Sequence, residues 1–380
     1  MKRLLGAILA WLAIPALAQS LPQVTPPPIA ARAYVLVDAQ SGATLAAAAE
    51  NDRFEPASLT KLMTAYLTFQ ALKEHRLEPA QALSVSARAV QAKGSRMYLD
   101  PRVPVTVDEL LKGLIVQSGN DAAVALAEAV AGSEEAFVQR MNQQAARLGL
   151  ANTHFVNASG EPARDHYASA RDIATLALAL MRDFPQEYPR YAQKEFLYNR
   201  IRQTNRNRLL WIDATVDGLK TGFTEAAGYC LVASAHRAER RLVSVVMGAQ
   251  SESLRVTESQ KLLNFGFQAY DTRRLYARDQ AVGQAEVFKG TQRSASLGFD
   301  HDVWLTLPRD RFDRLRAVLE TRQPFVAPLA RGQKAGIMKV TRETTTVAEI
   351  PVIALEDVPV AGFLSRGWDT LRLMLRHDTP

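Results

Sequence analysis

Apolar positions along the first two thirds of the chain change their spacing from one segment to the next. Short apolar runs at 34–37 and 44–46 flank a polar segment that contains glycine, which predicts a β-hairpin. The next apolar run has helical spacing from about Ser58 and predicts a helix with one buried stripe. Thr106 and Ser169 each precede such a run, with an acidic residue three positions later, as helix caps do. We therefore expect the middle of the chain to be helical.

Strand-like runs return after this helical region. Three of them, at 216–224, 228–235 and 241–248, are separated by short connections, which predict an antiparallel meander. From 275 to 360 short alternating runs are interrupted by prolines, and helical periodicity is absent, so this part predicts a small all-β domain, a sandwich or a barrel. We expect an α+β catalytic domain over 31–270, followed by this β-rich domain.

The last twenty residues, 361–380, predict an amphipathic helix. It is too short and too charged to cross a bilayer, so we expect it to lie at a membrane surface. The alternative is a helix packed on the β-rich domain or on a partner protein. The predicted apolar face consists of Phe363, Leu364, Trp368, Leu371, Met374 and Leu375, and the opposite side carries Arg366, Asp369 and Arg376.

The N-terminus predicts an exported protein. Residues 1–18 combine Lys2 and Arg3 with an apolar stretch and the small residues Ala16 and Ala18, which is typical of a cleaved signal peptide. The apolar stretch is short for a membrane anchor, which is the alternative. The segment 21–29 contains four prolines and predicts an unstructured connection to the folded part.

Composition narrows the function classes. The 380 residues are 47% hydrophobic and 22% charged, which is typical of a globular protein. The net charge is +7, but the basic residues are scattered, which argues against nucleic-acid binding and allows association with an anionic polymer or lipid. The single cysteine, Cys230, lies in an apolar run and predicts a core residue. The six histidines show no ligand spacing, so neither a metal nor another cofactor is expected.

Ser58-Leu59-Thr60-Lys61 occurs once in the chain and carries the candidate chemistry. Residues three apart share a helix face, so Lys61 Nζ can reach Ser58 Oγ. A hydroxyl becomes a good nucleophile when a neighbouring base takes its proton, and a buried lysine can be that base. The start of a helix also supplies N–H groups for a developing oxyanion. On its own, the motif fits a helix cap beside a solvated lysine as well.

Two further motifs follow in order, and each occurs once. Ser118-Gly119-Asn120 is predicted on a tight turn between two helices, where polar side chains can point into a cleft. Lys220-Thr221-Gly222 is predicted on the first strand of the meander. Strand alternation turns Lys220 and Gly222 to one side, and the glycine allows another backbone or a ligand to approach closely.

These motifs and their flanking residues resemble those of low-molecular-mass penicillin-binding proteins. The resemblance is to the D-alanyl-D-alanine carboxypeptidases, peptidase family S11, and it covers roughly 31–380. It implies a β-lactamase/transpeptidase-like fold, in which helices are inserted into an antiparallel sheet. It also implies a serine enzyme of cell-wall biogenesis and cell shape that removes the terminal D-alanine from peptidoglycan pentapeptide stems and is acylated by penicillins. The expected location is the periplasmic face of the inner membrane.

The same resemblance implies roles for individual residues. Ser58 would be the nucleophile and Lys61 its proton acceptor. Ser118 would relay a proton to the leaving group, Asn120 would hold the substrate amide, and Lys220 would set the electrostatic field.

Substrate binding is implied for a second group of residues. The strand residues Thr221 and Gly222 would contact the peptide, and the N–H groups of Ser58 and Phe223 would form the oxyanion hole. Arg255 matches the family arginine that grips the terminal carboxylate of the substrate. Without the resemblance, a solvated loop arginine is an equally good interpretation of Arg255.

Two departures from the family pattern bear on function. Phe223 stands where relatives carry histidine or another polar residue, which puts the deacylation rate in question. Glu161 replaces the usual leucine after Gly160, and we interpret it as a loop variation, although a carboxylate there could perturb the site.

Two other functions remain open. A class A β-lactamase needs a glutamate between the second and third motifs, and Glu161, Glu187 and Glu195 all lack its usual context. A catalytically silent wall-binding module is the other alternative, which the intact motifs disfavour.

Overall fold

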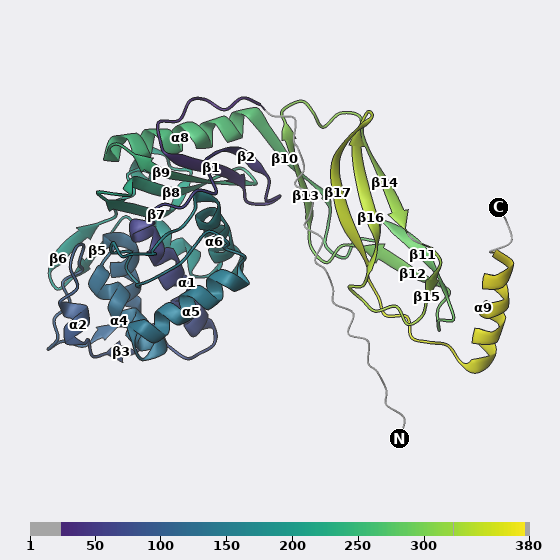
Figure 1. Cartoon of the computed structure of the whole chain (residues 1–380), viewed down its shortest axis with the longest axis horizontal. Coiled ribbons are helices and arrows are strands. Elements are labelled where there is room, and N and C mark those ends of the chain that lie inside the picture. Colours follow the sequence, from purple (N-terminus) through teal and green to yellow (C-terminus); the bar gives the residue numbers. More distant parts are fainter. Residues whose placement is uncertain (1–23, 322, 377–380) are drawn as a thin grey trace, which may run out of the picture. The chain divides into compact units, whose positions relative to one another are not determined.

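The computed structural model describes residues 24–321 and 323–376, with some side chains near the C-terminus left out (Figure 1). The predicted signal peptide, residues 1–18, lies outside the described residues. The chain divides into two compact units, and the first comprises 24–273 together with 304–309. The second comprises 274–303 and the described residues from 310 onward.

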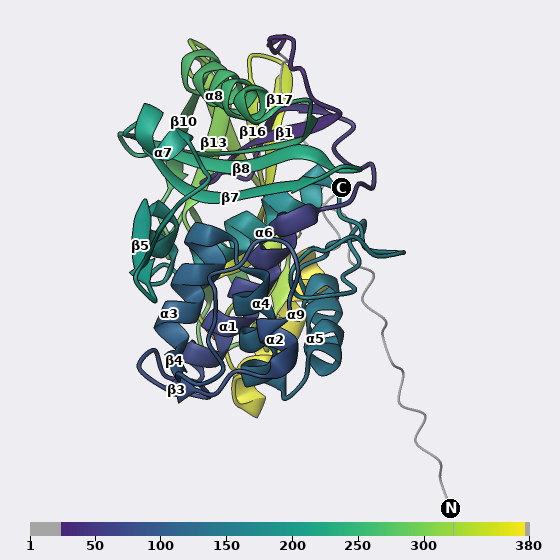
Figure 2. The same ribbon diagram turned by 90° about the vertical axis from the view of Figure 1, so that its left-hand side faces the viewer.

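A five-stranded antiparallel sheet forms one layer of the first unit, in the order β2-β1-β9-β8-β7. Its strands are β1 Ala33–Asp38, β2 Thr44–Ala48, β7 Val216–Thr224, β8 Gly228–Arg237 and β9 Arg240–Ala249. The predicted hairpin and meander are both confirmed. Helix α8, Glu252–Ala269, covers one face of this sheet, and the helical region lies on the other (Figure 2). Cys230 is buried in the sheet, as its apolar neighbours predict.

The helical region consists of elements between β2 and β7. The longer ones are α1 Lys61–Lys73, α3 Val107–Lys112, α4 Asn120–Ala131, α5 Glu134–Arg147 and α6 Ala170–Asp183, and the short ones are η1 Ala57–Thr60, α2 Ala87–Val90, η2 Gly113–Gln117, η3 Tyr188–Ala192 and α7 Leu209–Ile212. Two small antiparallel pairs complete it: β3 Ala82–Leu83 with β4 Val105–Thr106, and β5 Glu195–Tyr198 with β6 Ile201–Thr204. Thr106 makes the predicted capping box with Glu109, and Ser133 and Ser169 each accept a backbone N–H as helix caps.

The first helix departs from the prediction in two ways. Its α-helical part begins at Lys61, and Ser58 lies on the preceding 3₁₀ turn η1. The predicted single buried stripe is wrong, because 11 of the 13 residues of α1 are buried. Helices α4, α5 and α6 all pack against α1, so it has almost no solvent-facing side (Figure 2). The motif therefore spans the turn η1 and the first residue of this enclosed helix, Lys61.

The second unit is rich in β-structure, as predicted. Its six-stranded sheet has the order β14-β16-β17-β12-β11-β15. Strands β10 and β13 pair with each other, and each belongs in part to the first unit. The strands are β10 Tyr270–Tyr276, β11 Gly283–Phe288, β12 Ser294–Gly298, β13 Val303–Pro308, β14 Leu315–Thr321, β15 Phe325–Val326, β16 Lys334–Arg342 and β17 Thr345–Ala354. A small core that includes Val287, Leu329 and Val358 holds the larger sheet together.

The C-terminal helix α9, Phe363–Arg376, forms as predicted. Asp369, predicted on the side opposite the apolar face, is buried and accepts a hydrogen bond from Lys289 N at 2.6 Å. Arg372 lies 3.4 Å from Glu286 and stacks over Phe288. The polar side therefore holds the helix to β11 and the turn after it. The side chains of five residues named in the prediction are not described: Leu364, Leu371, Met374, Leu375 and Arg376.

Two large apolar residues of α9 are left exposed. The exposed fraction is 82% for Phe363 and 63% for Trp368. Among the described residues, no helix is long and apolar enough to cross a membrane.

Candidate active site

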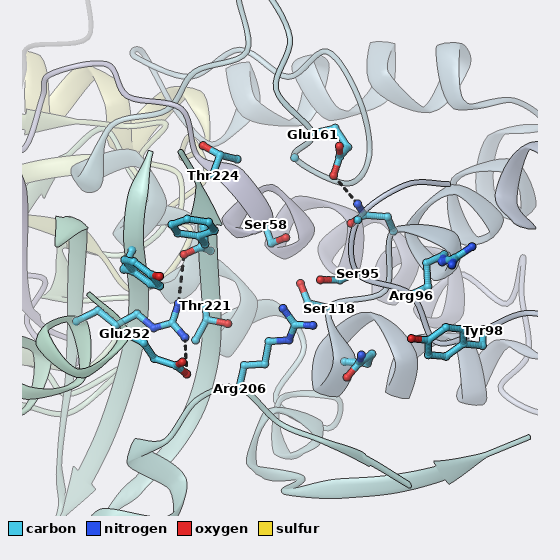
Figure 3. Close-up of a pocket in the computed structure, with 18 residues that line it drawn as sticks. Ser58, Ser95, Arg96, Tyr98, Ser118, Glu161, Arg206, Thr221, Thr224 and Glu252 are labelled. Atoms are coloured by element: carbon cyan, nitrogen blue, oxygen red, sulfur yellow. Dashed lines mark hydrogen bonds and ion pairs between the residues drawn. The ribbon is translucent and has the colours of Figure 1, made fainter. Parts of the chain in front are cut away.

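A cleft of about 590 Å³ opens between the sheet edge β7 and the helical region (Figure 3). Residues of all three motifs were predicted to form one site, and in the structure they lie at this cleft. Seven of the predicted residues line it: Ser58, Ser118, Asn120, Thr221, Gly222, Phe223 and Arg255. Lys61 and Lys220 lie beneath its surface, where they contact Ser58 and Ser118.

Ser58 is held on η1 close to strand β7. Ala57, immediately before it, has a left-handed backbone with φ of 47°. Gly222 allows the strand to come near: a Cβ at this position would lie 3.3 Å from Ser58 N and 3.2 Å from the Pro56 carbonyl oxygen. The predicted reason for this glycine, close backbone approach, is thus confirmed. The arrangement brings strand β7 against the backbone of Ser58.

Lys61 is almost completely enclosed, with 1% of its surface exposed. Its Nζ lies 2.9 Å from Ser58 Oγ, 2.7 Å from Asn120 Oδ1 and 2.5 Å from the Ser159 carbonyl oxygen. Burial disfavours the ammonium form and lowers the pKa of Lys61 from 10.5 to about 7, although the nearby carboxylate of Glu161 opposes this change. At neutral pH, a large fraction of Lys61 is therefore an uncharged amine.

Ser118 occupies a strained backbone position at the mouth of the cleft. Its φ of 63° is left-handed, which is uncommon for a residue with a side chain. The π-helical turn η2 ends at this residue, and Gly119 N donates to the Gly113 carbonyl oxygen at 3.0 Å. Lys220 Nζ donates to Ser118 Oγ at 2.8 Å. Burial, together with the charge on Lys61, lowers the pKa of Lys220 well below its usual value.

Asn120 is buried, and both of its amide hydrogens are used. Its Oδ1 accepts from Lys61, while its Nδ2 donates to the Lys93 carbonyl oxygen at 2.7 Å and to Glu161 Oε1 at 2.6 Å.

The next residue, Asp121, is also buried. Its carboxylate accepts from three successive backbone N–H groups, those of Met97, Tyr98 and Leu99. Asp121 therefore fixes the loop that forms one wall of the cleft, a role that the sequence did not reveal.

Arg255 lies on α8 rather than on a loop, and 4% of its surface is exposed. Its guanidinium is 3.1 Å from Glu252 Oε1 and 3.4 Å from the Gly222 carbonyl oxygen, and it stacks over Tyr229. Its Nε has no hydrogen-bond partner among the residues that the structure describes. Phe223 is 44% exposed and its ring packs on Tyr229, with ring centroids 4.4 Å apart. The guanidinium and the aromatic pair form one end of the cleft.

Lining residues that the sequence did not indicate include Arg96, Tyr98 and Arg206. Glu161, which we interpreted as a loop variation with a carboxylate that could perturb the site, also lines the cleft. Figure 3 shows Arg206 reaching into the cleft beside Ser118, and Glu161 across from it. Glu187 and Glu195, the other two glutamates considered for a β-lactamase, do not line this cleft and lie beside Arg190 and Arg202. Within the described parts of the chain, no cluster of ligating side chains could hold a metal ion.

Comparison with protein families matches nearly the whole folded chain. Residues 21–251 match the family model of D-alanyl-D-alanine carboxypeptidase, peptidase S11. Residues 270–360 match the model of the C-terminal domain of penicillin-binding protein 5.

Individual relatives agree with these matches. The D-alanyl-D-alanine carboxypeptidase DacA of Escherichia coli K12 is 41% identical over 360 residues, which cover 92% of this chain and 89% of the relative. The crystal structure of penicillin-binding protein 5 from Haemophilus influenzae superposes with a TM-score of 0.85 at 39% identity, over 88% of this chain and 99% of that one. Penicillin-binding protein D2 of Listeria monocytogenes, solved in its ampicillin-bound form, aligns with 63% of this chain and 98% of its own, at 28% identity and a TM-score of 0.58.

Proposed function

Because the chain belongs to the D-alanyl-D-alanine carboxypeptidase family of penicillin-binding proteins, we propose that Ser58 and Lys61 carry out the family reaction in it. The protein is a serine-type D-Ala-D-Ala carboxypeptidase that acts on peptidoglycan and binds penicillins. In the proposed reaction, Ser58 Oγ attacks the carbonyl carbon between the last two D-alanines. The amide bond breaks, D-alanine leaves, and water then hydrolyses the ester on Ser58. A β-lactam is attacked in the same way at its ring carbonyl.

The surroundings of Lys61 Nζ carry this proposal. A neutral amine has two hydrogens and one lone pair. Asn120 Oδ1 and the Ser159 carbonyl oxygen can only accept hydrogen bonds, so they take both hydrogens, at 2.7 and 2.5 Å. The lone pair is left for the third neighbour, the hydroxyl of Ser58 at 2.9 Å. Since burial keeps much of Lys61 uncharged at pH 7, this amine is arranged to accept the Ser58 proton.

The charge and the second proton of the reaction are assigned to the other two motifs. The N–H groups of Ser58 and Phe223 would stabilise the oxyanion, with Gly222 allowing the strand to lie against the start of η1. Ser118 Oγ would pass a proton to the departing amine. Lys220, 2.8 Å from Ser118 Oγ, would hold that hydroxyl and contribute to the field.

Substrate binding is assigned to the sheet edge and to Arg255. The strand that carries Thr221 can pair with an extended peptide through its backbone. Arg255 would bind the free carboxylate of the terminal D-alanine, because a guanidinium fork matches a carboxylate. Asn120 would hold the substrate's amide, as the family resemblance implies.

Replacement of the nucleophile tests the assignment. Ser58→Ala removes the only atom that can form the ester, so we expect loss of labelling by a fluorescent penicillin and of D-alanine release from a pentapeptide. Ser294→Ala, an exposed serine of β12, is the matched control and should leave both unchanged. Labelling of a folded Ser58→Ala protein would contradict the assignment. The lifetime of the label on the unaltered protein separates a carboxypeptidase from a β-lactamase, which would release it rapidly.

The exported, membrane-associated location is part of the same proposal. Peptidoglycan lies outside the cytoplasmic membrane, and residues 1–18 have the pattern of a signal peptide. Helix α9 is held by its polar residues Asp369 and Arg372, which leaves Phe363 and Trp368 exposed. Exposed aromatic residues on an amphipathic helix favour binding at a lipid surface. We assign the protein to the periplasmic face of the inner membrane, attached through α9.

A further inference from the structure

The amide of Asn120 has no hydrogen available for a ligand. An amide nitrogen carries two hydrogens, and Asn120 Nδ2 donates one to the Lys93 carbonyl oxygen and one to Glu161 Oε1. Its oxygen faces Lys61, so the amide cannot turn over without bringing two hydrogen donors together. The Glu161 carboxylate, which Figure 3 shows at the cleft, lies 2.6 Å from this nitrogen. A substrate carbonyl that needs Asn120 as a donor therefore finds both hydrogens taken.

The pair of Asn120 and Glu161 is built into its surroundings. The loop that carries Glu161 is organised by Asn157, whose Oδ1 accepts from the backbone N–H groups of Gly160 at 2.7 Å and Glu161 at 3.2 Å. Gly160 has φ of 87° and lies so close to the segment before Ser58 that a Cβ would be 1.8 Å from the Ala57 carbonyl oxygen.

Gly94 also lies close to the hydrogen bond between Asn120 and Glu161. A Cβ on Gly94 would lie 2.8 Å from Asn120 Nδ2 and 2.9 Å from Glu161 Oε1. Two glycines thus make room for this contact, and the backbone N–H of Glu161 is held by Asn157.

The two acceptors on Asn120 Nδ2 differ in their freedom to leave. The Lys93 carbonyl oxygen is part of the backbone, whereas the Glu161 carboxylate is on a flexible side chain of an exposed residue at the rim. We propose that Glu161 is a displaceable latch: in the empty cleft it occupies the Asn120 hydrogen that the substrate amide uses, and the substrate must move it aside to bind. This inference rests on the proposed role of Asn120 in holding that amide. Glu161 is a positioning residue, since it acts through Asn120.

The charge of Glu161 acts in the same direction as the hydrogen bond. The carboxylate stabilises the ammonium form of Lys61 and so raises its pKa against the larger effect of burial. Removal of the carboxylate would lower the pKa of Lys61 and increase the fraction of free base at neutral pH. The latch hypothesis therefore predicts that the enzyme becomes faster when Glu161 is lost, whereas a residue that merely supports the loop would make it slower.

Two variants separate the hydrogen bond from the charge. Glu161→Leu removes both, and Glu161→Gln removes the charge while its amide oxygen still accepts from Asn120. For Glu161→Leu we expect the rate of acylation by a fluorescent penicillin, and kcat/KM on a pentapeptide, to rise about threefold to tenfold, because a charge-assisted hydrogen bond no longer competes. For Glu161→Gln we expect a smaller rise. In both variants the acid side of the pH profile should move to lower pH.

Asp165→Asn is the matched control, because it removes a carboxylate from the same segment outside the cleft, at a left-handed position that asparagine tolerates. It should change neither the rate nor the pH profile. An unchanged or reduced rate in folded Glu161→Leu would overturn the latch, as would equal rates for the leucine and glutamine variants. Either result leaves the proposed function standing as long as Ser58→Ala abolishes labelling, so the two proposals fail separately.

Discussion

The pH dependence of acylation follows directly from the burial of Lys61. Its pKa of about 7, compared with 10.5 for a free lysine, corresponds to about 5 kcal/mol of difference between the two protonation states. At pH 7 about half of the enzyme has an uncharged Lys61, whereas a solvated lysine would be uncharged in about one molecule in 3,000. The enclosure of one side chain therefore increases the population of the reactive form by about a thousandfold.

The sign of the effect is fixed by the role of the amine. Lys61 accepts a proton only in its neutral form, so acylation should decrease as the pH falls through about 7. The neutral fraction is about nine tenths at pH 8 and about one tenth at pH 6, and the second-order rate constant for a fluorescent penicillin should fall about tenfold between them. Rapid-quench labelling across pH 5 to 9, with the protein's fold monitored by circular dichroism, measures this directly.

The lysine itself is tested by a charge-retaining variant. Lys61→Arg keeps a long cation beside Ser58, but a guanidinium does not lose its proton in proteins. We therefore expect this variant to remain unlabelled across the whole pH range. An acid limb centred above pH 9 in the unaltered protein, or substantial labelling of Lys61→Arg, would refute the argument that burial makes Lys61 the base.

Two further predictions concern the ends of the substrate and of the chain. Arg255→Ala should lower kcat/KM about tenfold to a hundredfold for a peptide with a free carboxylate, which is the range for a hydrogen bond between charged groups. The loss should be much smaller for the same peptide with a C-terminal amide. Equal losses on both substrates would show that Arg255 is structural. Without residues 361–380, the protein should no longer sediment with anionic vesicles. Its rate of D-alanine release from soluble pentapeptide should stay nearly unchanged. A truncated protein that still sediments with vesicles would place the anchor elsewhere.

Much of the fold was predictable wherever local chemistry decides the structure. The hairpin, the meander and the capping residues Thr106, Ser133 and Ser169 each depend on residues close together in sequence. Helix α8, Glu252–Ala269, was missed for a physical reason. Its buried positions follow the helical period, but Arg255, Glu258 and Ser259 occupy three of them, so the apolar pattern is interrupted. Buried polar residues, among them the cleft residue Arg255, thus hide this helix from a hydrophobicity argument.

The site shows the same division between motif and environment. Three short motifs identify the proposed reacting groups, because each places its side chains on one turn or one strand. The pKa of Lys61, however, is lowered mainly by burial, and it is raised in part by Glu161, a hundred residues further along the chain, so both effects depend on the completed fold. Glu161 was interpreted from sequence as a loop variation, since no local pattern connects it to Asn120. Its chemistry arises because Gly94 and Gly160 leave room for one carboxylate at 2.6 Å from that amide. The motifs therefore indicate which atoms react. The loops that enclose them determine the pH at which Lys61 is uncharged, and they place the Glu161 carboxylate where it competes with the substrate for Asn120.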